Sequence, residues 1–217
     1  MKKLTTKVQV LYALGVSYAI VDQIFAQWIL YFYLPSANSS LKPFMAPILV
    51  SIALAVSRFV DMITDPLVGF LSDKYNSKYG RRIPFIAVGT IPLVLVTIAF
   101  FYPPMSNEKA SFYYLMIVGS LFFTFYTIVG APYNALIPEI GRTPEERLNL
   151  STWQSVFRLS YTAIAIIFPG ILIKMIGGKD ELFGIRGMII FLCVIVFVGL
   201  AVTVFTVRER DYSTGEV

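Results

Sequence analysis

Three ionisable side chains, Arg58, Asp61 and Asp65, lie in a stretch of sequence that is otherwise too apolar for contact with water. On an α-helix these positions and Gly69 share one narrow face, because they are spaced by three and four residues. A charged group near the centre of a lipid bilayer costs roughly 2.5–3.5 kcal/mol on insertion scales. We therefore expect this face to point at the interior of a helix bundle or at an aqueous cavity.

Two carboxylates beside one arginine suggest cation binding. One guanidinium cannot fully neutralise both, so the second carboxylate is a candidate site for a proton or for a sodium ion held by oxygen atoms. Pro66 follows Asp65 and, lacking an N–H, leaves a backbone carbonyl free as a further ligand. The hydroxyls of Thr64 and Thr127 are candidates for the same site. The alternative is structural: the arginine and the first aspartate join helices, and the second aspartate reaches the membrane surface.

The composition indicates a polytopic membrane protein. Of 217 residues, 57% are hydrophobic and 14% are charged, and the mean hydropathy is +0.72. A soluble domain carries about 25% charged residues. The chain has no histidine, and its one cysteine, Cys193, lies in an apolar run, which argues against a disulfide framework, zinc chemistry and histidine-based catalysis. We find no nucleophile–base pair, so we expect no enzyme. The net charge of +5 indicates topology rather than nucleic-acid binding.

The apolar runs predict an all-α transmembrane fold, a six-helix bundle over residues 1–207 with a polar cytoplasmic tail at 208–217. The expected spans are residues 8–34, 44–73, 84–103, 111–138, 149–176 and 184–207. One set of connections holds eleven basic residues and the other five. The richer side should be cytoplasmic, which places both termini there. That side carries Lys2, Lys3, Lys7, Lys74, Lys78, Arg81, Arg82, Arg142, Arg147, Arg208 and Arg210; the other carries Lys42, Lys109, Lys174, Lys179 and Arg186.

Two sequence blocks carry a resemblance to a known family. Residues 58–85 contain R-x-x-D-x-x-x-D-P-x-x-G-x-x-S-D followed by G-R-R-x-P-F, and residues 131–139 read APYNALIPE. The first block resembles the second-helix signature of the glycoside–pentoside–hexuronide:cation symporters, the melibiose-permease-like branch of the major facilitator superfamily. The second block, followed by Glu146-Arg147, agrees with it. The resemblance implies the N-terminal six-helix half of a Na⁺- or H⁺-coupled symporter that works by alternating access, without another cofactor.

The resemblance also implies roles for individual residues. Asp61 and Asp65 match the family's cation-binding carboxylates, and Thr127 matches its hydroxyl ligand on the fourth helix. The loop after the second helix matches the cytoplasmic gate, with Asp73, Lys74, Gly80, Arg81 and Arg82. Glu139 with Arg142 or Arg147 is a possible paired contact of the same gate. For the loop after the second helix, and for Lys74 and Lys78 above all, the alternative is a basic anchor at the membrane surface. For Glu139 with Arg142 or Arg147, the alternative is a solvated cluster of charges.

The solute-binding half of the pattern is altered. The acids by which sugar-binding members hold hydroxyls on the first and fourth helices fall near Ile20 and at Gly130, and an arginine of the fifth helix falls near Ser155. Other polar and aromatic residues at mid-helix then become the candidate solute contacts. Trp28 and Trp153 are also candidates, and the alternative role for these two is packing or anchoring at the membrane interface. Asp22 and Arg158 can instead form an ion pair with each other. The candidates are Asp22, Gln23, Gln27, Tyr126, Tyr133, Asn134, Gln154 and Arg158.

The length matches only half of a twelve-helix transporter. We expect the chain to be a fragment, one of two paired half chains, or one subunit of a homodimer, in contact with membrane lipid. The first hypothesis is a cation-coupled transporter of a small polar solute, a sugar or glycoside. The alternatives are a half that does not transport, and the same fold carrying a lipid-like solute.

Overall fold

The computed structural model describes residues 4–36, 39–207 and 209–212, and within them the chain is α-helical without a β-strand. The all-α prediction is confirmed. Lys2, Lys3, Arg208 and most of the predicted tail lie outside the described residues. The part of the tail that is described, 209–212, forms a short helix.

The helices follow one another with short connections. In chain order they are α1 (Thr6–Ala13), η1 (Leu14–Tyr18), α2 (Ala19–Gln23), η2 (Ile24–Ile29), α3 (Leu30–Tyr33), α4 (Pro47–Lys74), α5 (Ile83–Ala99), α6 (Glu108–Ile140), α7 (Pro144–Ile167), α8 (Pro169–Gly177), α9 (Glu181–Thr206) and α10 (Glu209–Tyr212).

Local capping explains where several of the long helices begin. The side chain of Asn107 accepts hydrogen bonds from two backbone N–H groups at the start of α6. Thr143 and Glu146 form a reciprocal capping box at α7, directly before Pro144, and Asp180 accepts from the N–H of Phe183 at α9. Each cap satisfies N–H groups that have no partner within their own helix.

The first predicted span is one continuous helical path with two irregular turns. η1 is a 3₁₀ segment and η2 a π segment, and they interrupt the α-helix from Thr6 to Tyr33. Backbone carbonyls near η1 accept hydroxyl groups from other helices: Tyr161 donates to Leu14 (3.3 Å) and Thr203 to Leu11 (2.9 Å). These bonds satisfy backbone groups of a helical path that is long and apolar enough to cross a membrane.

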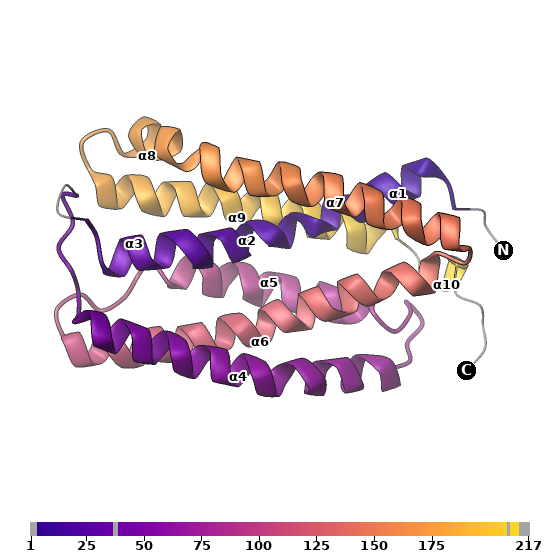
Figure 1. Cartoon of the computed structure of the whole chain (residues 1–217), viewed down its shortest axis with the longest axis horizontal. Helices are drawn as coiled ribbons and strands as arrows, with labels where there is room; N and C mark the ends of the chain where they lie inside the picture. Colours follow the sequence, from indigo (N-terminus) through magenta and orange to yellow (C-terminus); the bar gives the residue numbers. More distant parts are fainter. Residues whose placement is uncertain (1–3, 37–38, 208, 213–217) are drawn as a thin grey trace.

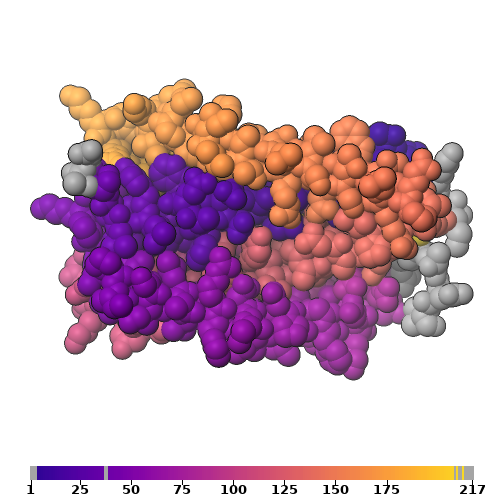
Figure 2. All heavy atoms as spheres, in the orientation of Figure 1, coloured from indigo at the N-terminus to yellow at the C-terminus, as the bar shows by residue number. Residues whose placement is uncertain are grey.

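The helices form two groups with the first span between them. In Figure 1, α7, α8 and α9 lie along one side of the bundle, and α4 and α6 along the other. In the first span, 67% of its most apolar window is buried, compared with 17% for α4, which packs mainly on α6. Figure 2 shows α4 along one edge of this face of the molecule. One side of α4 is therefore left without a protein neighbour among the described residues.

Four described helical paths are long and apolar enough to cross a membrane: Thr6–Tyr33, Pro47–Lys74, Glu108–Ile140 and Glu181–Thr206. The path through α7 and α8 is a fifth if it counts as one span. It bends by 46° at its break, where Pro169 lacks an N–H. α5 has 17 residues, about 25 Å at 1.5 Å per residue. It is shorter than the predicted span 84–103, because residues after Ala99 turn away.

Candidate functional site

Thr127 of α6 lies against both aspartates of α4. Its Oγ1 is 2.6 Å from Asp65 Oδ1 and 3.2 Å from Asp61 Oδ1. The threonine is buried, Asp61 is half-buried and Asp65 is exposed. A hydroxyl has one hydrogen to donate, so it cannot donate fully to both carboxylates at once. Oxygen atoms from α4 and α6 thus lie close together at this position, and the carboxylate of Asp65 is exposed on the outside of the bundle.

A close contact between α4 and α6 positions these residues. The Ser57 hydroxyl donates to the carbonyl of Ala53 (2.9 Å) and lies 3.4 Å from that of Met116 on α6. A methyl group added at Gly119 would overlap the Ser57 side chain. Asp65 follows Ser57 by eight residues, and Thr127 follows Gly119 by eight. The two helices therefore run side by side from the Ser57–Gly119 contact to the carboxylates.

Arg58 is held by aromatic rings as well as by charge. Its Nη1 is 3.6 Å from Asp61 Oδ2. Its guanidinium carbon lies 4.1 Å from the ring centre of Phe123 and 5.0 Å from that of Phe25, distances suited to cation–π attraction. Within the described part of the chain, no ion pair reaches Asp65. The predicted charge imbalance on α4 is therefore present in the structure.

Thr64 is not brought to the carboxylate groups. Its hydroxyl donates along the helix to the backbone carbonyl of Asp61, at 3.1 Å. The sequence placed it beside Asp65 but did not indicate this local bond, which serines and threonines within helices commonly form.

A second polar network joins the first span to α6 and α7, and Tyr18 is its centre. Arg158 Nη2 donates to the Tyr18 hydroxyl (2.9 Å), which in turn lies 3.4 Å from Asn134 Oδ1. Gln154 Nε2 donates to the same amide oxygen, at 2.8 Å. The ring of Tyr126 packs edge-on against Tyr18, with centroids 5.6 Å apart. Three of the predicted solute contacts, Tyr126, Asn134 and Arg158, thus meet at Tyr18, and Gln154 joins them through Asn134.

Tyr133 is placed differently from the prediction. It is fully buried, and its ring stacks on Tyr12 at 4.7 Å. Each hydroxyl donates to the backbone carbonyl of the other tyrosine, at 2.8 and 3.1 Å. Tyr133 therefore joins α6 to α1 and presents no free polar group to a solute.

The other candidates on the first span lie beside this network. Asp22, one turn after Tyr18, is half-buried, and no ion pair links it to Arg158 in the described residues. Gln27 donates to Gln23 at 2.9 Å, so these amides satisfy each other in part. The alternative of a mutual pair between Asp22 and Arg158 is not what the structure shows: Arg158 donates to Tyr18 instead.

A charged cluster lies where α4, α5 and α6 meet at the end of the bundle that holds α10 (Figure 1). Glu139 Oε1 accepts from Arg82 Nε at 3.0 Å and from Arg81 Nη2 at 3.2 Å. Arg82 also pairs with Asp73 and donates to Ser72 Oγ at 2.7 Å. We call Asp73, Arg81, Arg82 and Glu139 the arginine cluster. It brings together four of the predicted gate residues.

The predicted partners of Glu139 in the loop after α6 are wrong. Arg147 Nε donates to the carbonyl of Gly141 at 2.8 Å and so caps the end of α6. Arg142 donates to the carbonyl of Tyr212 through Nε and Nη2, at 3.0 and 2.8 Å. Both arginines bind backbone carbonyls, because the C-terminus of a helix leaves such acceptors unpaired.

Sequence reasoning missed two residues in these networks. Tyr18 is one helical turn before Asp22, so its shared face was a usable signal. Glu209 accepts from the backbone N–H groups of Arg81 (2.8 Å), Arg82 (2.9 Å) and Ile83 (3.3 Å). Nothing in the sequence around Glu209 indicates that contact, since it depends on α10 folding back on residues more than a hundred positions earlier.

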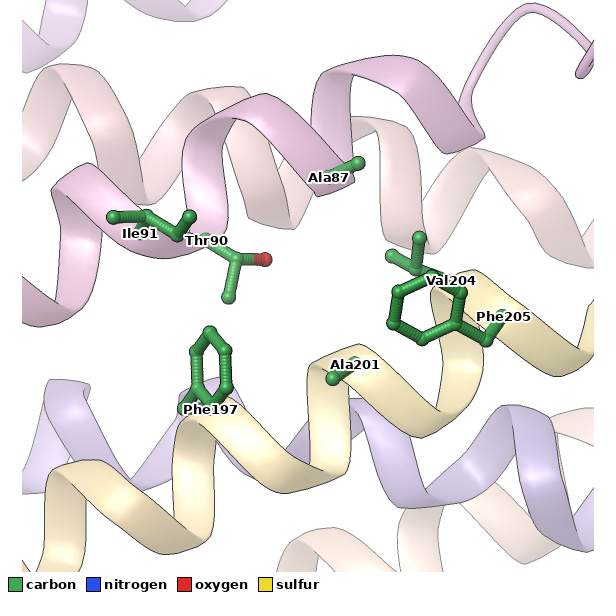
Figure 3. A pocket seen from close by; sticks show the side chains of 7 residues that line it. All are labelled: Ala87, Thr90, Ile91, Phe197, Ala201, Val204 and Phe205. Atoms are coloured by element: carbon green, nitrogen blue, oxygen red, sulfur yellow. The ribbon is translucent and has the colours of Figure 1, made fainter.

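A separate hollow lies between α5 and α9, lined by Ala87, Thr90, Ile91, Phe197, Ala201, Val204 and Phe205 (Figure 3). The hydroxyl of Thr90 donates to the carbonyl of Ile86 at 2.6 Å and so offers no free donor to a ligand. None of the predicted site residues lines this hollow. It is an apolar surface feature and not part of either polar network.

Comparison with known proteins agrees with the fold. The family described as MFS/sugar transport protein matches residues 11–216. The inner membrane symporter YicJ of Escherichia coli is 31% identical over 155 residues, which is 71% of this chain and 34% of that relative. The putative glycoside/cation symporter YagG of the same organism is 34% identical over 157 residues, with the same two shares.

A third relative, the sodium-dependent lysophosphatidylcholine symporter 1-A of Danio rerio, is 32% identical over 131 residues, 59% of this chain and 24% of the relative. The matched region thus spans about a third or less of the length of these relatives. The chain is an integral membrane protein with the helical architecture of the major facilitator superfamily. It belongs to the family of MFS/sugar transport proteins.

Proposed function

We propose that this chain is one half of a cation-coupled symporter, and that Asp61, Asp65 and Thr127 bind the coupling ion, Na⁺ or H⁺. The observation that carries the proposal is the contact of one buried hydroxyl with two carboxylates on a neighbouring helix, at 2.6 and 3.2 Å. A cation placed among these oxygens would be attracted by the negative charge that Arg58 leaves uncompensated. The names of the relatives, which include cation and sodium-dependent symporters, support the same function.

The solute would bind beside the Tyr18 network. Arg158, Gln154 and Asn134 supply hydrogen-bond donors and acceptors, and Tyr18 and Tyr126 supply ring faces. This combination suits a hydroxylated solute such as a sugar or glycoside. The lysophosphatidylcholine symporters among the relatives make a lipid-like solute the second candidate.

A second bundle would complete the cavity, supplied by another half or by a second copy of this chain. The Arg58 side chain is 55% exposed and Asp65 is exposed, both on a helix with one unpartnered side. Charged groups at membrane depth need protein or water around them. In this arrangement the arginine cluster would form the cytoplasmic gate, with Gly80 in its loop. The end of the bundle that carries α1 and α10 (Figure 1) would face the cytoplasm.

The test is uptake by the native assembly reconstituted in vesicles, driven by a sodium or a proton gradient. Labelled glycosides and lysophosphatidylcholine serve as alternative solutes. We expect gradient-driven uptake that is lost in Asp61→Asn and in Asp65→Asn and retained in Glu145→Gln, which changes an exposed carboxylate of α7. Uptake that survives both aspartate substitutions would show that the ion binds elsewhere.

A further inference from the structure

The carboxylate of Glu209 is buried at the start of α5. The residue is 2% exposed, and its two oxygens accept the N–H groups of Arg81, Arg82 and Ile83 at 2.8, 2.9 and 3.3 Å. The N–H groups of Arg81 and Arg82 precede α5 and that of Ile83 begins it, and none of the three has a partner within the helix. The positive end of the helix dipole also favours a negative charge at this position.

The loop before α5 is shaped around this carboxylate. Gly80 has a φ of 112°, which residues with a side chain rarely adopt, and a methyl group there would overlap the Glu209 side chain. The Ser77 hydroxyl donates to the Gly80 carbonyl at 2.7 Å and steadies the same turn. The turn thus places three successive N–H groups toward one side chain.

The backbone that Glu209 holds is the backbone that carries the arginine cluster. The side chains of Arg81 and Arg82 both reach Glu139 Oε1, at 3.2 and 3.0 Å. Glu139 Oε2 is buried without a hydrogen-bond donor among the described residues, so the two arginine contacts both fall on Oε1. A small shift of the α5 start would separate the arginines from this single oxygen.

The other end of α10 is also fixed. Arg142, just after α6, donates twice to the carbonyl of Tyr212, whose side chain is buried. The four residues of α10 therefore connect the loop before α5 to the loop after α6. α10 begins three residues after the end of α9, so we expect displacement of the end of α9 to affect both loops.

We propose that Glu209 is a positioning residue of the gate: through the N–H groups of Arg81, Arg82 and Ile83 it aligns both arginines on Glu139 and couples the end of α9 to the arginine cluster. The proposal rests on the assignment of this cluster as the gate. It adds a residue that contacts neither ion nor solute and acts on the rate at which the transporter changes conformation.

The first test measures hydrogen exchange of the full chain in detergent or nanodiscs. In Glu209→Ala the amides of Arg81, Arg82 and Ile83 should exchange about tenfold faster or more, because each loses a hydrogen bond to a charged acceptor. Glu209→Gln, which keeps an acceptor oxygen, should recover part of the protection. Glu145→Ala, an exposed glutamate of α7, is the control. Unchanged exchange of the three amides in Glu209→Ala overturns the proposal.

The second test uses the native assembly in the uptake assay. Glu209→Ala should lower the maximal rate about tenfold, an expectation based on the same lost bonds, and leave the half-saturating cation concentration within about twofold. A variant with the opposite pattern, a normal rate and weakened cation binding, contradicts a gate role. If the wild type transports nothing, the proposed function fails. The exchange experiment still tests whether Glu209 protects the amides at the start of α5.

Discussion

At the scale of single residues, Thr127 deserves the first experiment because its hydroxyl touches both carboxylates. Thr127→Val keeps the shape of the side chain and removes the oxygen. We expect the apparent cation affinity to fall about tenfold or more, since a hydrogen bond to a charged group is worth about 1.5–3 kcal/mol. Thr127→Ser should retain most of the affinity. Cation-dependent thermal stabilisation of the purified protein measures both.

A matched control is available on α5. Thr97 is buried like Thr127, and its hydroxyl donates to the carbonyl of Leu93 at 2.7 Å. Thr97→Val should change stability without changing cation affinity. If Thr127→Val behaves in the same way, the hydroxyl is a packing element and not a ligand.

Tyr18 provides the second test at this scale. Tyr18→Phe removes the hydroxyl that links Arg158 to Asn134 and leaves the ring contact with Tyr126. We expect solute affinity to weaken about tenfold, equivalent to about 1.4 kcal/mol for one hydrogen bond to a charged group, with cation affinity unchanged. Solute half-saturation in the uptake assay measures it. Tyr33 is the control, because its buried hydroxyl donates to the carbonyl of Phe100. Tyr33→Phe should leave the solute affinity unaltered.

At the scale of elements, the distance between α4 and α6 is set where Ser57 faces Gly119. Gly119→Ala introduces a methyl group into this contact, and overpacking of this kind costs about 1–3 kcal/mol. We expect lower thermal stability together with weaker cation binding. The compensating pair Gly119→Ala with Ser57→Gly should recover both, because it restores the space between the helices.

The control for this pair is Gly170→Ala on α8, where a methyl group meets open space. Its stability should stay within about 0.5 kcal/mol of the wild type, the range typical of surface substitutions. Loss of stability in Gly119→Ala without any effect on cation binding would mean that the contact supports the fold alone.

The sequence predicted the helices and the charged face of α4 because apolar length and residue spacing are local properties. It also placed Asp61, Asp65 and Thr127 in one candidate site, a grouping with which the family resemblance agreed. The expectation for Tyr133 failed because spacing does not tell whether a buried hydroxyl finds a backbone carbonyl, here that of Tyr12. Glu209 was missed because its partners are distant in the chain, and no periodicity reports such a contact.

At the scale of the whole molecule, orientation is the open prediction. The distribution of basic residues predicts that the α4–α5 loop faces the cytoplasm. In a background with Cys193→Ala, Tyr79→Cys in that loop should react with a membrane-impermeant maleimide only from the cytoplasmic side, and Lys42→Cys only from the outside. Both positions are exposed and Cys193 is buried. The reverse pattern of labelling would invert the proposed topology.

α6 carries residues of both candidate sites. Thr127 and Asn134 are seven residues apart on it, about 10 Å along the axis at 1.5 Å per residue, and Pro132 lies between them. If the proposed ion and solute both bind residues of this helix, a change in the helix on binding one can alter the affinity for the other. If the cation strengthens solute binding by some factor, the solute must strengthen cation binding by the same factor. The bend that Pro132 permits in α6 is then a place where the size of that linkage can be adjusted without changing either set of ligands.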